Sequence, residues 1–201
     1  MSKFKNTKKI ISDNFNKKIS FYNNDKYLGL NVNKTEIYSV TKFLKDNERL
    51  LFDQLIDITA IDYPSRDLRF DIIYILISLT LNQRIIVKSP INENDNLDSI
   101  SLIHKSANWY ERECYDLFGI KFINHPDLRR IMTDYNFEGH PLRKDFPLTG
   151  HTEVRYDDLE KKVVYEPVKL TQEYRNFDYM SPWEGLDNNL IDDDKSEDDS
   201  K

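Results

Sequence analysis

The chain has 201 residues, with 29 Lys and Arg against 35 Asp and Glu, so its formal net charge is -6. An acidic body argues against duplex nucleic acid as a partner, because clustered Lys and Arg drive binding to phosphates. A single cysteine, Cys114, excludes an internal disulfide and, from this chain alone, a thiolate zinc site or an iron-sulfur cluster.

The two ends of the chain carry opposite charges. Residues 1–20 hold six lysines and one aspartate (6 - 1, giving +5), and residues 187–201 hold seven acids and two lysines (2 - 7, giving -5). Both ends are polar, so we expect a basic N-terminal arm at 1–26 and an acidic disordered tail at 187–201. We expect no transmembrane segment, signal peptide or Arg-rich presequence, because no apolar stretch is long enough and the first arginine is Arg49.

Residues 27–123 are predicted to form an α+β domain. A short strand is expected at 27–32. An amphipathic helix is expected at 35–51, because its apolar residues recur at spacings of three and four and Thr35 can serve as its N-cap.

Three further strands are predicted from runs rich in β-branched and apolar residues. The runs cover 52–63, 68–79 and 85–87, and short polar turns separate them. Such spacing favours an antiparallel meander. The polar segment 89–98 is then expected to be a loop.

A second helix is predicted from Asp98 or Ser99 to a stop at Gly119, and it would cover the sheet. Cys114 falls on its apolar stripe. A buried, inert cysteine is therefore favoured over a nucleophile working with His125 or His140.

The segment 124–186 is predicted to be extended, because prolines interrupt it and its apolar periodicity is weak. A hairpin is expected at 153–156 and 162–168. The segment contains aromatic residues, in which disordered segments are poor, so we expect it to lie along the surface of another protein. The predicted fold is thus a small mixed or antiparallel sheet covered by helices, followed by an extended C-terminal segment that docks on a neighbouring subunit.

Four charged residues gather on the second helix: Glu111, Arg112, Glu113 and Asp116. Glu113 and Asp116 could share a face, as paired carboxylates do in metal or acid/base sites. Arg112 and Asp116, four residues apart, could equally form a helix ion pair. We favour a structural charge network, because no Glu-x-x-His pattern follows.

The histidines His125, His140 and His151 fit no compact zinc pattern, and we expect them to pack or to form hydrogen bonds. No glycine-rich phosphate loop occurs. Arg129, Arg130 and the pair 143–144 stand among acidic residues, which suits a polar interface.

One stretch carries a family resemblance. Residues 111–132, ERECYDLFGIKFINHPDLRRIM, resemble the signature of the NuoC-type, or 30-kDa, subunit of proton-pumping NADH:quinone oxidoreductase (respiratory complex I). The stretches at 57–64, 133–150 and 153–185 are also similar to this family. The resemblance covers about residues 27–185.

The resemblance implies an α+β subunit of the peripheral arm without chemistry of its own. NAD, FMN, iron-sulfur clusters and ubiquinone would be bound by partner subunits, and this chain would scaffold the quinone-reducing module beside the 49-kDa-type and PSST-type subunits of a hetero-oligomer. No catalytic, cofactor or metal residue is then expected. The structural and interface residues would be Glu111, Arg112, Glu113, Asp116, His125, Pro126, Asp127, Arg129 and Arg130.

The chain is rich in Phe, Tyr, Met, Ile, Asn and Lys, which AT-rich codons encode. Together with the resemblance and the expected lack of a presequence, this composition implies a mitochondrially encoded subunit on the matrix side of the inner membrane. The competing origin is an AT-rich bacterium. The alternatives are the equivalent subunit of a related membrane-bound hydrogenase, a free-standing metal-dependent enzyme using Glu113, Asp116 and a histidine, and an adaptor outside any respiratory complex.

Overall fold

A computed structural model describes residues 4–15, 18–23, 26–170 and 172 of the chain. The chain divides into two compact units, 1–150 and 151–201. The predicted acidic tail at 187–201 lies outside the described residues, as does the predicted extended segment from 173 to 186.

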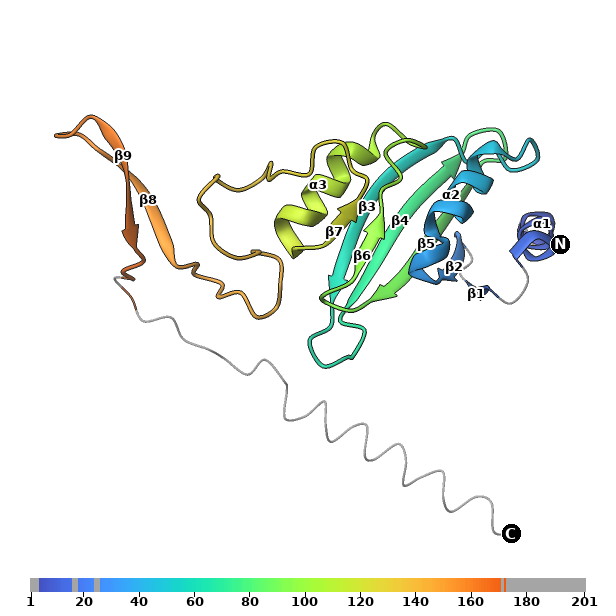
Figure 1. The fold of residues 1–201 in the computed structure, drawn as a ribbon, viewed down its shortest axis with the longest axis horizontal. Coiled ribbons are helices and arrows are strands. Elements are labelled where there is room, and N and C mark those ends of the chain that lie inside the picture. Colours follow the sequence, from blue (N-terminus) through green and yellow to red (C-terminus); the bar gives the residue numbers. More distant parts are fainter. Residues whose placement is uncertain (1–3, 16–17, 24–25, 171, 173–201) are drawn as a thin grey trace, which may run out of the picture. The chain divides into compact units, whose positions relative to one another are not determined.

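A five-stranded mixed sheet forms the centre of the first unit, in the order β1-β2-β5-β4-β3 (Figure 1). Its strands are β1 Ile19–Asn23, β2 Leu28–Val32, β3 Gln54–Asp62, β4 Phe70–Ser78 and β5 Gln83–Ile91. The predicted antiparallel meander is confirmed by β3, β4 and β5, and β2 joins β5 in parallel. The predicted α+β class with a small mixed sheet is therefore correct.

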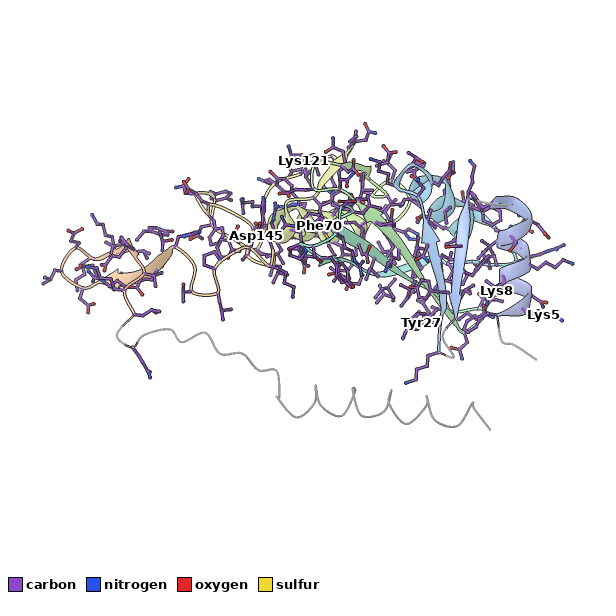
Figure 2. The ribbon with its side chains drawn as sticks, turned by 90° about the horizontal axis from the view of Figure 1, so that it is seen from below. Lys5, Lys8, Tyr27, Phe70, Lys121 and Asp145 are labelled. Atoms are coloured by element: carbon purple, nitrogen blue, oxygen red, sulfur yellow. The ribbon has the colours of Figure 1, made fainter. Side chains whose placement is uncertain are left out.

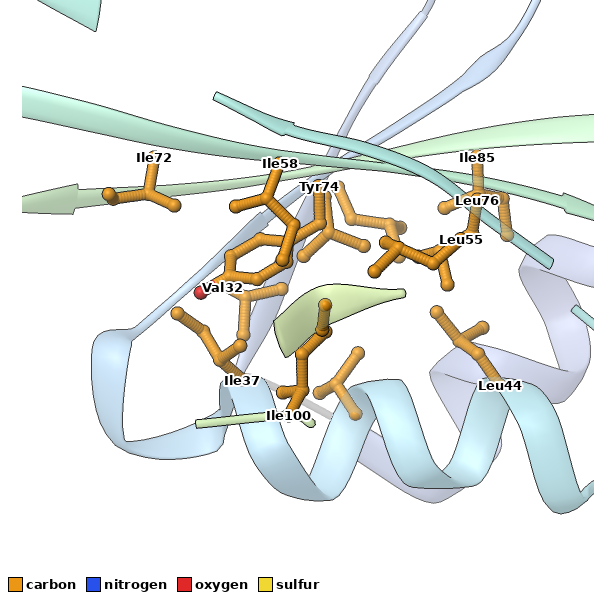
Figure 3. Packing of buried hydrophobic residues seen from close by; sticks show 14 of the residues in the cluster. Val32, Ile37, Leu44, Leu55, Ile58, Ile72, Tyr74, Leu76, Ile85 and Ile100 are labelled. Carbon is orange, nitrogen blue, oxygen red and sulfur yellow. The ribbon is translucent and has the colours of Figure 1, made fainter. Parts of the chain in front are cut away.

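Alternation of side chains explains why the central strand stays in register. In β4 every second residue, Phe70, Ile72, Tyr74 and Leu76, is buried. Because strand side chains alternate between faces, these residues form one apolar face. Figure 3 shows this face packing toward Ile37 and Leu44 of α2 (Ile37–Asp46).

The first predicted helix is shorter than expected. A 3-10 turn, η1 (Lys34–Glu36), leads into α2, which ends at Asp46 rather than at residue 51. Thr35 is not the cap. The side chain of Asn33 instead accepts from the backbone N–H of Thr35 at 3.2 Å, and so satisfies a free donor of the turn.

The second helix, α3 (Ala107–Phe118), begins about eight residues later than predicted. The short strand β6 (Asn96–Asp98) pairs in parallel with β7 (Lys121–Ile123), and turns fill the interval before α3. The end is as predicted, since Gly119 adopts the left-handed conformation with φ 82°. The helix lies against β3, where the buried Cys114 thiol donates to the carbonyl of Ile58 at 3.2 Å.

The basic N-terminal arm expected at 1–26 contains a helix and a strand among its described residues. Helix α1 (Lys5–Phe15) buries Ile11 in the core, and β1 pairs with β2. Figure 2 shows Lys5 and Lys8 on this helix, and the Lys8 ammonium lies 5.9 Å from the ring centre of Phe21 in β1. Tertiary packing overrides the weak local apolar pattern of this segment.

The first unit also extends beyond the predicted domain boundary at residue 123. Residues 124–150 contain no helix or strand, but they belong to this unit. The second unit contains the predicted hairpin, formed by β8 (Thr152–Asp157) and β9 (Lys162–Pro167) in antiparallel register.

Candidate functional site

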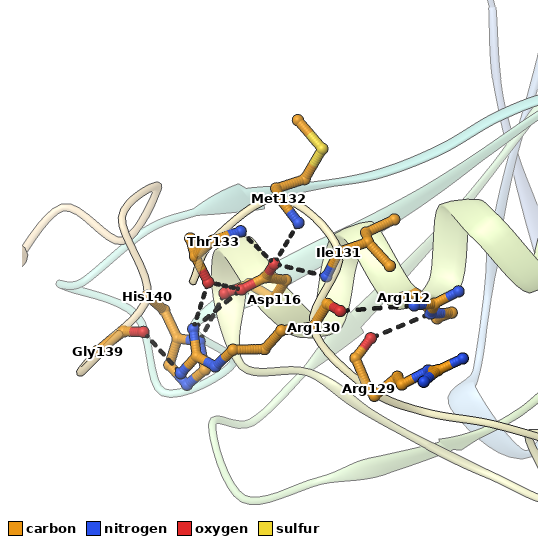
Figure 4. Close-up of polar contacts among 9 residues, drawn as sticks. All are labelled: Arg112, Asp116, Arg129, Arg130, Ile131, Met132, Thr133, Gly139 and His140. Atoms are coloured by element: carbon orange, nitrogen blue, oxygen red, sulfur yellow. Dashed lines mark hydrogen bonds and ion pairs between the residues drawn. The ribbon is translucent and has the colours of Figure 1, made fainter. Parts of the chain in front are cut away.

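The residues singled out from the sequence meet around α3. Glu111, Arg112, Glu113 and Asp116 lie on the helix, and residues 125–130 follow β7. Figure 4 shows Arg112 and Asp116 of the helix facing Arg129 and Arg130. We call residues 127–148 the wrapping segment. Its backbone has little regular structure, so side chains must satisfy its polar groups.

Asp116 is the centre of this arrangement. Its buried carboxylate accepts from the backbone N–H groups of Ile131 (3.0 Å), Met132 (2.7 Å) and Thr133 (2.9 Å). It also accepts from the Thr133 hydroxyl at 2.6 Å and from Nη1 of Arg130 at 2.9 Å. Burial alone would raise the pKa of this carboxyl, but the hydrogen bonds from Thr133, Met132 and Ile131 outweigh it and lower the pKa to about 2.

Two arginines complete the attachment of the wrapping segment. Arg112 donates from Nε to the carbonyl of Arg129 at 3.1 Å and from Nη2 to that of Arg130 at 3.5 Å. Arg130 donates to the carbonyl of Gly139 at 3.0 Å. The suggested Arg112–Asp116 ion pair is therefore replaced by contacts from both side chains to the wrapping segment, which helical spacing cannot foresee.

Glu111 fixes the turn that precedes the helix. Its buried carboxyl accepts from the Ser99 hydroxyl at 2.6 Å and from the backbone N–H of Ile100 at 2.7 Å. Burial raises the pKa of Glu111 to about 7, and these two hydrogen bonds oppose the rise. The bonds fix residues 99 and 100 directly before the turn at 101–103, which explains why the helix starts late.

His125 lies beside Glu111, with Nε2 3.8 Å from the carboxyl oxygen. Its Nε2 is 3.0 Å from the carbonyl of Asn108, and its Nδ1 accepts from the backbone N–H of Asp127 at 3.1 Å. These contacts assign the donor role to Nε2 and the acceptor role to Nδ1. The prediction of a hydrogen-bonding histidine is confirmed.

The remaining predicted residues lie farther out. Pro126 is exposed, and Asp127 pairs with Arg129 at 2.9 Å on the surface. Glu113 is half-buried. His140 packs against Gly119 and bonds through Nδ1 to the carbonyl of Asp116 at 2.8 Å. Within the described ranges, no three His, Cys, Asp or Glu side chains are grouped as metal ligands would be.

A second buried acid, which the sequence reasoning missed, holds the far end of the wrapping segment. Asp62 accepts two bonds from Arg69, at 2.8 and 3.0 Å, and one from the backbone N–H of Lys144 at 2.7 Å. Arg69 also contacts Asp145 at 2.9 Å. The hydrogen bonds from Arg69 lower the pKa of Asp62. The polarity of 143–145 was noted from the sequence, but its partners could not be, since Asp62 ends β3 and Arg69 directly precedes β4.

Large apolar side chains of the wrapping segment point outward. Tyr135 is 88% exposed and Leu148 is 83% exposed, and Met132 and Leu142 are each at least half exposed. Buried carboxylates thus hold a loop in one conformation while it presents apolar groups to the surroundings. Such pre-ordering suits an interaction surface, because little conformational freedom is left to lose on binding.

Comparison with known proteins shows the family to which this chain belongs. The family model described as "Respiratory-chain NADH dehydrogenase, 30 Kd subunit" matches residues 30–152. The NuoC-type subunit of the NADH-quinone oxidoreductase of Cereibacter sphaeroides is 56% identical over 169 residues, which cover 84% of each chain. The corresponding subunit of Parvibaculum lavamentivorans is 59% identical over 161 residues, 80% of each chain.

A solved structure shares the fold. A chain of the membrane-bound sulfane sulfur reductase, an archaeal respiratory membrane complex, superposes with a TM-score of 0.63 at 24% identity. The match covers 73% of this chain and 86% of that one. None of the described helices is long and apolar enough to span a bilayer.

Proposed function

Because the chain belongs to the 30-kDa subunit family of respiratory-chain NADH dehydrogenases, we propose that it is a core peripheral-arm subunit of an NADH:ubiquinone oxidoreductase (complex I). It scaffolds the quinone-reducing module and performs no chemistry of its own. Electrons pass from NADH through iron-sulfur clusters of neighbouring subunits to ubiquinone, with coupled proton translocation.

The observation that carries the scaffolding role is the attachment of the wrapping segment. Asp116 uses both carboxyl oxygens on donors from residues 130–133. A metal ion at Asp116 would have to displace these donors, which argues against the alternative of a metal-dependent enzyme. The role of this carboxylate is to hold the exposed apolar loop in place.

The partners and location in this proposal go beyond the family match. The 49-kDa-type and PSST-type subunits are the neighbours, and FMN, NAD, iron-sulfur clusters and ubiquinone are held by subunits other than this chain. The chain lies at the matrix side of the inner mitochondrial membrane. The genome that carries the coding sequence tests the location, since a bacterial chromosome would place the subunit at the cytoplasmic membrane instead.

Deletion of the gene for this chain in the organism that carries it tests the function. Membranes without it are expected to lose NADH:ubiquinone reductase activity and to recover it when the full chain is restored. The isolated chain is expected to contain no stoichiometric flavin, iron or acid-labile sulfide. Full activity of membranes that lack the chain would refute the proposal, and a cofactor bound by the isolated chain would refute its non-catalytic part.

A further inference from the structure

The hairpin of the second unit has two chemically distinct faces. In its register, Val154 stands opposite Tyr165 and Tyr156 opposite Val163. Paired residues share a face of an antiparallel ladder, so these four side chains form one surface, which we call the apolar face. Each of the four is between 53% and 61% exposed.

The opposite face is charged and largely satisfied within the hairpin. Arg155 pairs across the strands with Glu166 at 2.5 Å and along its own strand with Asp157 at 3.2 Å. Val164 is the apolar residue on this side and stands opposite Arg155. Of the two faces, the apolar one therefore has more to gain from contact with another protein, because it alone exposes a continuous hydrophobic surface to water.

A two-stranded hairpin is at best marginally stable unless something covers a face of it. The apolar face presents on the order of 400 Å². Two copies packed through it alone would bury about 800 Å², less than the roughly 1,200 Å² of a stable interface. A second copy is thus a poor occupant, whereas a subunit of a larger complex has further contacts to add.

The sequence similarity to a curated relative also extends over the residues of the hairpin. The family model ends at residue 152, where β8 begins. The match to the Cereibacter subunit, however, covers 169 residues of this chain. A span of 169 residues starting at residue 1 or later cannot end before residue 169, so it includes the whole hairpin. This favours an occupant that the two chains have in common.

We propose that the apolar face, formed by Val154, Tyr156, Val163 and Tyr165, is the side of the hairpin that binds a partner subunit of the respiratory complex. The bound surface is apolar protein that also offers acceptors to tyrosine hydroxyls, since tyrosine brings an apolar ring and a polar tip to interfaces. The inference rests on the proposed function and assigns the contact within it. The ion-paired face stays toward water.

Adjacent residues of β9 provide a matched pair of variants, because Val163 lies on the apolar face and Val164 on the charged face. In the full chain, Val163→Asp is expected to lower the fraction assembled into the NADH-oxidising complex about tenfold, since it buries an unpaired charge. Val164→Asp, placed beside Arg155, is expected to change that fraction less than twofold. Equal effects of the two substitutions would overturn the assignment.

Hydroxyl-radical footprinting of the unsubstituted protein provides a readout that does not depend on folding of a variant. Tyr156 and Tyr165 are expected to be oxidised at least about fivefold more slowly in the assembled complex than in the isolated full chain. Equal rates would overturn the proposal. Two results with the isolated chain would also overturn it: protection of the tyrosines that is lost when residues 173–201 are removed, and protection that rises with protein concentration. In either case the occupant of the apolar face would be this chain itself. If the unsubstituted chain enters no such complex, the proposed function fails instead.

Discussion

At the scale of single residues, two buried carboxyls of α3 differ in protonation because their hydrogen-bond donors differ. Asp116 receives five bonds, one of them from a guanidinium, whereas Glu111 receives two from neutral groups. Burial acts on both, but only at Asp116 do the donors prevail. The stability that Asp116 contributes should therefore be lost as the pH falls toward 2, whereas the stability that Glu111 contributes should be lost as the pH rises toward 7.

Replacement of Asp116 by asparagine should destabilise the first unit strongly. The variant leaves Arg130 without its buried partner and turns an amide N–H₂ toward backbone donors, so we expect a loss of about 3 kcal/mol or more in the free energy of unfolding. Denaturant unfolding of the full chain measures it. Glu113→Gln, three residues away and half-buried, is the control and should cost less than about 0.5 kcal/mol. A similar loss in both variants would refute the central role of Asp116.

Glu111 should make the protein less stable as the pH rises. The pKa of its carboxyl is about 7 in the folded state against 4.5 ordinarily, so the folded state keeps a proton that the unfolded state has lost. Stability from this group is fully present below pH 4.5 and is lost as the pH rises to about 7, by roughly 3 kcal/mol. Glu111→Gln should reduce the pH dependence of the free energy of unfolding measured between pH 5 and 8. An unchanged slope in the variant would contradict the assignment.

The residue types at this site were predictable, but their partners were not. The sequence placed Glu111, Arg112 and Asp116 together on a helix and favoured a structural role for them. It could not show that Asp116 binds residues 131–133, because those donors are backbone groups whose position depends on the path of a loop. Asp62 was missed for the same reason, since its donor at Lys144 is 82 residues away.

At the scale of elements, the sheet meander and the stop of α3 followed from local patterns. Alternating β-branched residues and a glycine in the left-handed region are signals that need no tertiary information. The start of α3 did not follow. Ile100 and Ile103 have helical spacing, yet Glu111 binds the backbone N–H of Ile100 and residues 101–103 form a turn. Helix α1 was missed because its burial rests on few apolar residues.

The end of α3 gives a prediction at this scale. An added Cβ at Gly119 would lie 2.7 Å from the ring of His140, and the φ of 82° is unfavourable for any side chain. Gly119→Ala should lower unfolding free energy by about 2 kcal/mol. In a His140→Ala background the same change should cost about 1 kcal/mol, because only the backbone strain remains. Equal costs in both backgrounds would show that the ring does not restrict this position.

At the scale of the whole molecule, the chain combines a packed α+β unit with a hairpin in which no residue between 151 and 170 is fully buried. The wrapping segment and the apolar face of the hairpin both expose large apolar side chains. Both features make sense for a subunit whose surfaces are completed by other chains. The sequence indicated this from the proline-rich second half, whose local pattern could not supply a core.

Native-gel electrophoresis of gently solubilised membranes, with in-gel NADH oxidation and mass spectrometry of the active band, tests the central claim most directly. We expect this chain in the active band, in a fixed ratio to flavin-binding and iron-sulfur subunits. Its absence from an active band that contains those subunits would contradict the assignment to the peripheral arm of an NADH:ubiquinone oxidoreductase.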